Sequence, residues 1–153
     1  MKKNPMTRAL RPDKFTLAGL EATLLLCLDA SSAARDIPTV RMILEGKDPL
    51  AKRARRIASQ LRKRCPEAGI SVVDIYSEVG GGSFPDMVIP AVGVALQPPA
   101  MTVADMEKRL RRLTVPVIAR IEKEKLILDM RTVLAQDEGD LVKGVASVLE
   151  NAG

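Results

Sequence analysis

Residues 70–97 read ISVVDIYSEV (70–79), GGGS (80–83), FPDMV (84–88) and IPAVGVALQ (89–97), and this stretch decides the fold. Its first and last segments have the Val and Ile content that favours strands, and the glycine run breaks the first of them. Pro90 lies near the start of the last segment and Pro98-Pro99 end it, which are positions where strands tolerate proline. We therefore expect two strands, over residues 70–79 and 89–97.

The rest of the chain adds a hairpin and several helices. Val115–Ile121 and Lys125–Val133 form the clearest hairpin, with a turn near Lys123-Glu124. A further extended segment or strand is expected over residues 37–44. Helical spacing and cap residues predict helices over Phe15–Asp29 with Asp13 or Thr16 as cap, Asp48 (cap, before Pro49) to Cys65-Pro66, Thr102 (cap, with Asp105) to Leu113, and Asp137–Asn151. The pattern predicts an α+β fold, a small antiparallel sheet with helices on one face.

Composition excludes several classes of function. The chain of 153 residues has only three aromatic residues, so Leu, Ile, Val, Ala and Met must fill its core. It has no histidine, which excludes Ser-His and Cys-His nucleophile pairs and His-ligated metal sites. No apolar run has the length of a membrane span and no signal peptide is recognisable, so we expect no membrane partner. Cys27 and Cys65 lack metal-binding spacing and suggest reduced thiols in a cytoplasmic protein.

The charge is concentrated in the first half. Residues 1–66 carry 15 Lys and Arg against 6 Asp and Glu, a balance of +9, whereas the remainder carries −4. Residues 49–66, which we call the basic segment, contain seven cations and no acid. A solvated helix face is the simpler interpretation, and a surface for a phosphate backbone is the alternative. The lack of interleaved aromatic residues argues against stacking on single strands.

Two arginines lie between prolines just ahead of the first predicted helix. Arg8 and Arg11 are permanently charged and offer planar donor groups, which suit a phosphate or a similar oxyanion. A plain surface pair is the alternative. Lys14 follows and could add positive potential, whereas Asp13 is better explained as a helix cap than as a partner of the arginines.

Four sequence blocks, in order across nearly the whole chain, resemble bacterial selenocysteine synthase, the L-seryl-tRNA(Sec) selenium transferase family. Each block is weak alone, and together they are a strong signal. They are RALRPDK with LAGLEATL (8–14 and 17–24), IPTVRM (37–42), VGGGSFP (79–85), and PVIARIE with LDMRTV (116–122 and 128–133).

The resemblance implies an enzyme that uses pyridoxal 5′-phosphate and has the aspartate-aminotransferase-like fold, known as fold type I. Such enzymes convert seryl-tRNA(Sec) to selenocysteinyl-tRNA(Sec) with selenophosphate and assemble as homo-oligomers. This chain would be the C-terminal part: residues 1–30 ending the large-domain segment, and residues 31–153 forming the small domain. The lysine that binds the cofactor would lie upstream, so the chain alone should be inactive and needs the missing N-terminal and large domains as partners.

The resemblance also assigns candidate site residues. Arg8 and Arg11 match the paired arginines that line the selenophosphate site, although Pro12 departs from the pattern and biases Arg11 away from helical geometry. Gly81 and Gly82 could present backbone N–H groups to an anion, but a bulge or a strand connection is the simpler interpretation. Arg120 either forms a cross-strand salt bridge with Asp129 or contributes to the substrate site.

Two other functions remain open. One is a free-standing RNA-binding or interaction module that uses the basic segment and needs no cofactor. The other is a fragment of a related lyase or aldolase with the same cofactor. The helix over residues 15–29 has more apolar surface than one contact covers. Because the missing domain should lie against it, we predict that the chain self-associates or aggregates when expressed alone.

Overall fold

The computed structural model describes residue 6 and residues 10–78 and 88–151, and the chain forms two compact units, Met1–Leu44 and Glu45–Gly153. The two units are described separately below. The domain division expected near residue 30 concerns the complete enzyme and stays a prediction. The predicted glycine-rich connection, residues 80–83, lies outside the described residues.

The described residues of the first unit include the helices α2 (Lys14–Cys27), α3 (Ala30–Asp36) and α4 (Pro38–Leu44). Asp13 caps α2: its carboxylate accepts hydrogen bonds from the backbone N–H groups of Phe15 (2.8 Å) and Thr16 (3.0 Å), as the sequence predicts. Asp29 caps α3 in the same way, and hydrogen bonds from Ser32 and Ser31 lower the pKa of Asp29 to about 2. Both caps therefore satisfy N–H groups that a helix start leaves without partners.

The expectation of a strand over residues 37–44 is wrong, because this segment is α4. Its β-branched residues favour strand, but Pro38 stands at the first helical position. Proline is well suited to that position, since its φ is already helical and its missing N–H would have no partner there. The backbone N–H of Arg41 donates to the carbonyl of Ile37 at 3.0 Å and continues the helical pattern.

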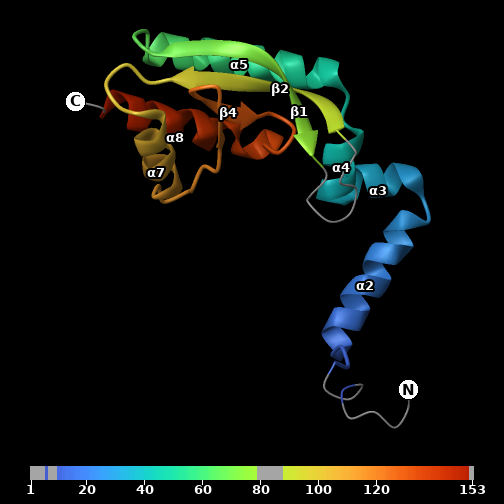
Figure 1. Cartoon of the computed structure of the whole chain (residues 1–153). Helices are drawn as coiled ribbons and strands as arrows, with labels where there is room; N and C mark the ends of the chain where they lie inside the picture. Colours follow the sequence, from blue (N-terminus) through green and yellow to red (C-terminus); the bar gives the residue numbers. More distant parts are fainter. Residues whose placement is uncertain (1–5, 7–9, 79–87, 152–153) are drawn as a thin grey trace. The chain divides into compact units, whose positions relative to one another are not determined.

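The second unit is an α+β domain, as predicted, with a four-stranded antiparallel sheet (Figure 1). Its strands are β1 (Gly69–Glu78), β2 (Val88–Gln97), β3 (Arg120–Glu122) and β4 (Lys125–Asp129), in the order β1-β2-β4-β3. β1 and β2 pair along ten residues, from Gly69 opposite Gln97 to Glu78 opposite Val88. Both strands expected from the first quoted stretch are therefore confirmed within one or two residues of their predicted ends.

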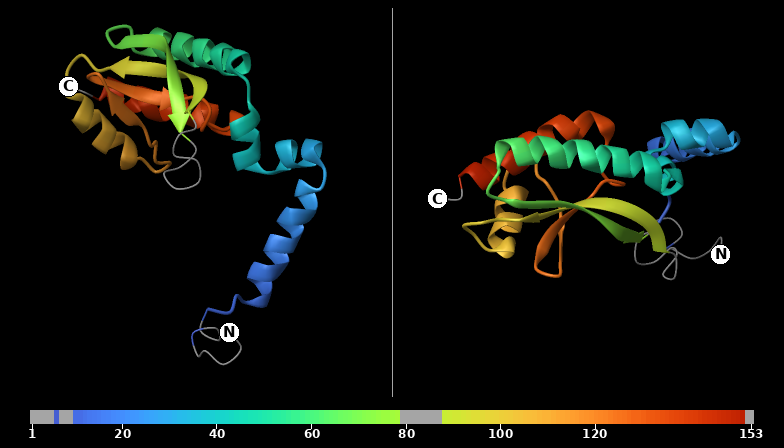
Figure 2. Two further views of the ribbon diagram at one scale, coloured as in Figure 1. Left: turned by 45° about the vertical axis from the view of Figure 1, so that its right-hand side comes forward. Right: turned by 90° about the horizontal axis from the view of Figure 1, so that it is seen from above.

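Three helices accompany the sheet: α5 (Lys47–Arg64), α7 (Val103–Arg111) and α8 (Glu138–Glu150), the last preceded by the short 3₁₀ helix η1 (Ala135–Asp137). Figure 2 shows α5 and α8 on the same side of the sheet. α5 begins one residue before the predicted cap Asp48, because Gly46 occupies the cap position in an extended conformation. The Thr102 cap of α7 is confirmed, and α8 buries the four predicted residues Leu141, Val145, Val148 and Leu149.

The side chains of neighbouring residues in the sheet alternate between its two faces. Val94 on β2 and Leu128 on β4 are opposite each other, and Leu128 shares a hollow with Leu141 of α8, so these residues face the helices. The other side, which we call the far face, includes Gly93 between the buried side chains of Ile75 and Ile127. The glycine leaves room for the two isoleucines to approach each other.

The predicted hairpin is present but shorter than expected. Lys123 and Glu124 form its turn, and both have positive φ, 49° and 60°, as the tight turns of two-residue hairpins require. The first strand begins only at Arg120. Upstream of it, the backbone N–H of Val117 donates to the carbonyl of Leu110 at 3.0 Å, which ties that stretch to α7 instead of to the sheet.

Candidate functional site

The structure describes two of the three predicted cations near the N-terminus. Arg11 and Lys14 are exposed, and Arg8 lies outside the described residues. Arg11 precedes α2 without regular secondary structure, which agrees with the influence expected of Pro12. The carboxylate of Asp13 is used by the α2 cap, and its hydrogen bonds with Thr16 lower its pKa. Arg11 has no ion-pair partner within the described residues.

A polar cluster lies where β1, β2 and β4 approach one another. The hydroxyl of Ser77 donates to the carboxylate of Asp129 at 2.5 Å, and the other oxygen of Asp129 accepts from the backbone N–H of Arg131 at 3.0 Å. Arg131 is buried, and its guanidinium donates to the carbonyl oxygens of Glu45 and Pro90, both at 2.8 Å. These bonds join the start of the domain to three strands, which is a structural role.

The predicted salt bridge between Arg120 and Asp129 is wrong. Arg120 pairs in register with Ile127, and its guanidinium donates to the carbonyl oxygen of Tyr76 at 2.9 Å. Its nearest carboxylate is that of Glu122, at 3.8 Å. Tyr76 and Arg120 lie on the two outer strands, so the sheet must curl strongly at this end for the contact to form. Gly81 and Gly82, the other candidates from this region, lie outside the described residues.

The basic segment uses most of its cations inside the molecule. Arg53 donates to Glu138 at 2.6 Å, to Glu45 at 3.1 Å and to the carbonyl oxygen of Val133, and Arg56 also binds Glu138. Arg62 and Arg64 likewise have intramolecular partners. Within the described part of the chain, the cations of this segment without a partner are Lys52, Arg55 and Lys63.

Glu138 is the acceptor at the centre of this ion cluster. Burial would raise the pKa of Glu138, but the hydrogen bonds from Arg53 and Arg56 outweigh burial and lower it. The carboxylate therefore stays charged and holds the start of α8 against α5. This arrangement explains why a segment that resembles a nucleic-acid surface in the sequence is largely a packing surface in the structure.

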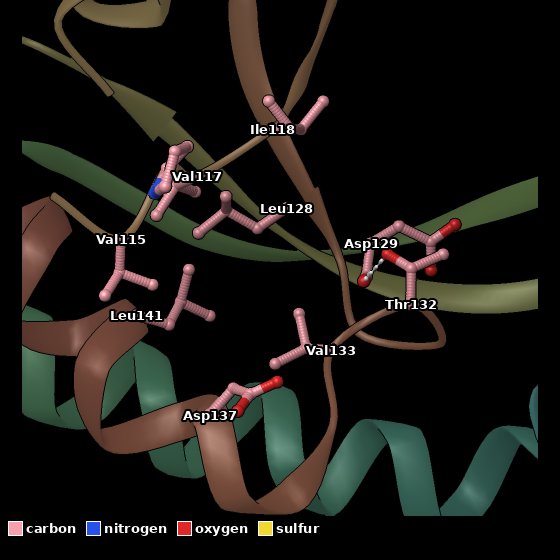
Figure 3. Close-up of a pocket in the computed structure, with 10 residues that line it drawn as sticks. Val115, Val117, Ile118, Leu128, Asp129, Thr132, Val133, Asp137 and Leu141 are labelled. Atoms are coloured by element: carbon pink, nitrogen blue, oxygen red, sulfur yellow. Dashed lines mark hydrogen bonds between the residues drawn. The ribbon is translucent and has the colours of Figure 1, made fainter. Parts of the chain in front are cut away.

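A hollow of about 470 Å³ lies between residues 115–118, β4 and the start of α8 (Figure 3). Val117, Leu128 and Leu141 give it apolar walls, and Asp129 and Asp137 contribute the only carboxylates among its described lining residues. None of the described residues that line it is a Lys or an Arg. This chemistry is unsuitable for a phosphate, a selenophosphate or a tRNA backbone, so the hollow is not the predicted anion site.

Sequence reasoning missed the structural roles of Arg53, Arg131 and Ser77. Arg131 lies within the predicted hairpin range Lys125–Val133, but the sequence indicates no partner for it, and its neighbour Asp129 is expected to pair with Arg120. The run Leu-Asp-Met-Arg-Thr over residues 128–132 marked the position as important, but the contacts to Glu45 and Pro90 join residues that are 86 and 41 positions apart. Patterns of local spacing carry no signal for such contacts.

Comparison with known proteins now places the chain in a family. The sequence profile of a family described as L-seryl-tRNA selenium transferase matches residues 1–134. The chain belongs to the L-seryl-tRNA selenium transferase family. It is 45% identical over 140 residues to the L-seryl-tRNA(Sec) selenium transferase of Desulfotalea psychrophila, 41% over 138 residues to that of Geobacter sulfurreducens, and 40% over 150 residues to that of Clostridium botulinum.

The matches cover this chain almost completely but its relatives only in part. The three alignments include 91%, 90% and 98% of the chain, which spans 30–32% of the length of these curated relatives. The four sequence blocks are thus explained by membership of the transferase family, and the chain corresponds to a fragment of its relatives. In the described residues, no helix is both long and apolar enough to cross a membrane.

Proposed function

We propose that this chain is the C-terminal part of an enzyme that converts seryl-tRNA(Sec) to selenocysteinyl-tRNA(Sec), with selenophosphate as the selenium donor. The observation that carries the proposal is the family match over residues 1–134, together with three relatives that share one named activity. Since the chain spans about a third of those relatives, it performs the reaction only together with the remaining two thirds. The fold type I architecture and the homo-oligomeric assembly belong to the same proposal.

The described residues do not fit a site for pyridoxal 5′-phosphate. The family's cofactor needs a lysine for covalent attachment, held in an enclosed pocket with donors for the phosphate. Every lysine that the structure describes is exposed, and Lys14 lies on the first turn of α2, which has no buried residue. We therefore assign the cofactor site, and its lysine, to the part of the enzyme that this chain does not contain.

In this proposal Arg8 and Arg11 bind the anionic selenium donor. Selenophosphate carries negative charge, and fixed guanidinium groups would hold it in the orientation needed for transfer. The support from the structure is that Arg11 is exposed and that Asp13, its nearest acid in sequence, is used by a helix cap. Lys14 adds positive potential beside it.

The alternatives have less support. An independent RNA-binding module would need the basic segment, but Arg53 and Arg56 are used by Glu138, and Arg62 by the backbone of β1. A lyase or an aldolase with the same cofactor would not explain why the three relatives are all named as selenium transferases.

A chimaera tests the proposal. The matching third of the Desulfotalea psychrophila relative is replaced by this chain, and selenocysteinyl-tRNA(Sec) formation is measured with selenophosphate and added cofactor. We expect the chimaera to be active and the isolated chain to be inactive. A folded chimaera with no activity would contradict the proposal.

The arginine assignment is tested in the same chimaera. Loss of a charged hydrogen-bonding partner weakens binding by roughly 1.5–3 kcal/mol, so Arg11→Ala should raise the KM for selenophosphate about tenfold or more. Arg35→Ala is the matched control, because Arg35 is an exposed arginine of the same unit that pairs with Asp36. An equal KM for the two variants would show that Arg11 does not bind the donor.

A further inference from the structure

β1 is a long strand at the edge of the sheet. It has ten residues, and within the part of the chain that the structure describes it pairs with β2 alone. An edge strand presents a row of backbone N–H and C=O groups that can pair with an extended strand of another molecule. The other edge strand, β3, has three residues and presents a much smaller row.

The strand register shows which groups of β1 point outward. The backbone N–H of Met130 donates to the carbonyl of Val92, so the polar groups of Val92 point toward β4. Because these directions alternate along a strand, Ala91 and Gly93 point toward β1. Their partners Ile75 and Val73 are thus hydrogen-bonded to β2. The backbone N–H and C=O groups of the alternate residues of β1, which are Ile70, Val72, Asp74 and Tyr76, therefore point to the open edge.

Cationic side chains occupy both ends of this open row. Arg62 of α5 donates to the outward carbonyl of Ile70 through two nitrogens, at 2.9 and 3.0 Å. Arg120 of β3 donates to the outward carbonyl of Tyr76 at 2.9 Å. The two arginines are 58 positions apart in the sequence, yet each donates to a carbonyl that an added strand would need.

An ion pair lies between these two points. Lys47, in the first turn of α5, lies 2.9 Å from the carboxylate of Asp74. Charges on an edge strand oppose strand addition, because an incoming strand must desolvate them. The outward carbonyl oxygens of Ile70 and Tyr76 therefore already accept hydrogen bonds, and Asp74 between them carries a charged side chain.

We infer that Arg62 and Arg120 prevent β1 from pairing with an extended strand, in the first place β1 of a second copy of the chain. We call these two residues the guards. This inference does not depend on the proposed enzymatic function. It gives Arg120 a role that does not involve a substrate. It also explains why Arg62, a cation of the basic segment, donates its hydrogen bonds to β1.

The test compares two double variants of the full chain. In Arg62→Ala/Arg120→Ala the guards are absent, and in Arg55→Ala/Lys63→Ala two exposed cations without partners are removed instead. We expect the guard variant to form an additional concentration-dependent species in analytical ultracentrifugation. In that species the amides of Val72 and Tyr76 should exchange about tenfold more slowly with solvent than in the control variant, because they become paired.

A third substitution separates strand pairing from loss of stability. The N–H of Asp74 points to the open edge, so Asp74→Pro removes no bond to β2 but blocks strand addition. Added to the guard variant, it should abolish the new species, whereas it cannot restore a destabilised fold. Association that persists in this triple variant, or a guard variant that associates no more than its control, would overturn the inference. Any association through α2 should be the same in all these variants, so it does not affect the difference between the guard variant and its control.

Discussion

Replacement of Gly93 by alanine is expected to destabilise the domain, although alanine normally suits a strand better than glycine. A Cβ atom at this position would lie 2.9 Å from the carbonyl oxygen of Leu128, 3.0 Å from Cδ1 of Ile75 and 3.1 Å from Cγ2 of Ile127. The carbonyl belongs to the neighbouring strand β4, so a side-chain rotation cannot relieve the contact. β2 and β4 would have to move apart.

Two opposing effects set the magnitude. Overpacking of a close contact costs typically about 1–3 kcal/mol. Replacing glycine also reduces the conformational freedom of the unfolded chain, which stabilises the folded state by about 0.5–1 kcal/mol. We therefore expect the free energy of unfolding to fall by about 1–2 kcal/mol.

The chain offers a convenient assay and a matched control. Tyr76 is the only tyrosine and there is no tryptophan, so intrinsic fluorescence in a urea titration reports on β1 alone. Gly139→Ala in α8 is the control, because no atom lies within 4 Å of the added Cβ. It should leave stability unchanged or raise it by at most about 1 kcal/mol. Equal stability of the two alanine variants would refute the argument that Gly93 is needed for close approach.

Replacing Glu138 by glutamine should cost about 2 kcal/mol, less than the roughly 3–5 kcal/mol of a fully buried pair because Arg53 keeps its contact with Glu45. The pKa of the Glu138 carboxyl is lowered from 4.5 in the folded state. Its contribution to the free energy of unfolding is therefore present above pH 4.5 and is lost as the pH falls. The urea midpoint should decrease more on acidification in the native chain than in the glutamine variant. Thr102→Ala removes the cap that accepts from the N–H of residue 105 at 3.1 Å and should lower the free energy of unfolding by about 1 kcal/mol, again measured with urea. The exposed leucines of α2 should cause self-association, and Leu20→Ser with Leu24→Ser should reduce the mass observed by light scattering; a native chain that is monomeric at moderate concentration would contradict this prediction.

The fold was predictable where local patterns determine it. The strand pair over residues 69–97, the Lys123-Glu124 turn and the inner face of α8 each follow from periodicity, turn chemistry or apolar spacing within one element. α4 was not predictable in this way. Its β-branched residues favour a strand, and the proline that begins the helix has the same appearance in an extended segment.

The contacts of Arg120, a candidate site residue, were not predictable from the sequence. The resemblance assigned Arg120 to a functional motif, and spacing on a hairpin made Asp129 its obvious partner. The contact with Tyr76 depends on how the sheet curls, and curling results from the packing of the whole domain. Asp129 in turn is held by Ser77, which comes from a strand 52 residues earlier.

The arginines show why charge content alone is a poor guide to a nucleic-acid surface. A guanidinium binds a phosphate, a carboxylate or a carbonyl with the same planar donors, so the seven cations of the basic segment show that acceptors are needed but not which acceptors they are. In this domain the acceptors are internal for Arg53, Arg56, Arg62 and Arg64. Among the described residues, Lys52, Arg55 and Lys63 of the basic segment have no such acceptor, and neither does Arg11 outside it, because the nearby carboxylate of Asp13 is already used as a helix cap. An anion site is therefore better sought by finding cations that the fold leaves unpaired than by finding where cations are dense.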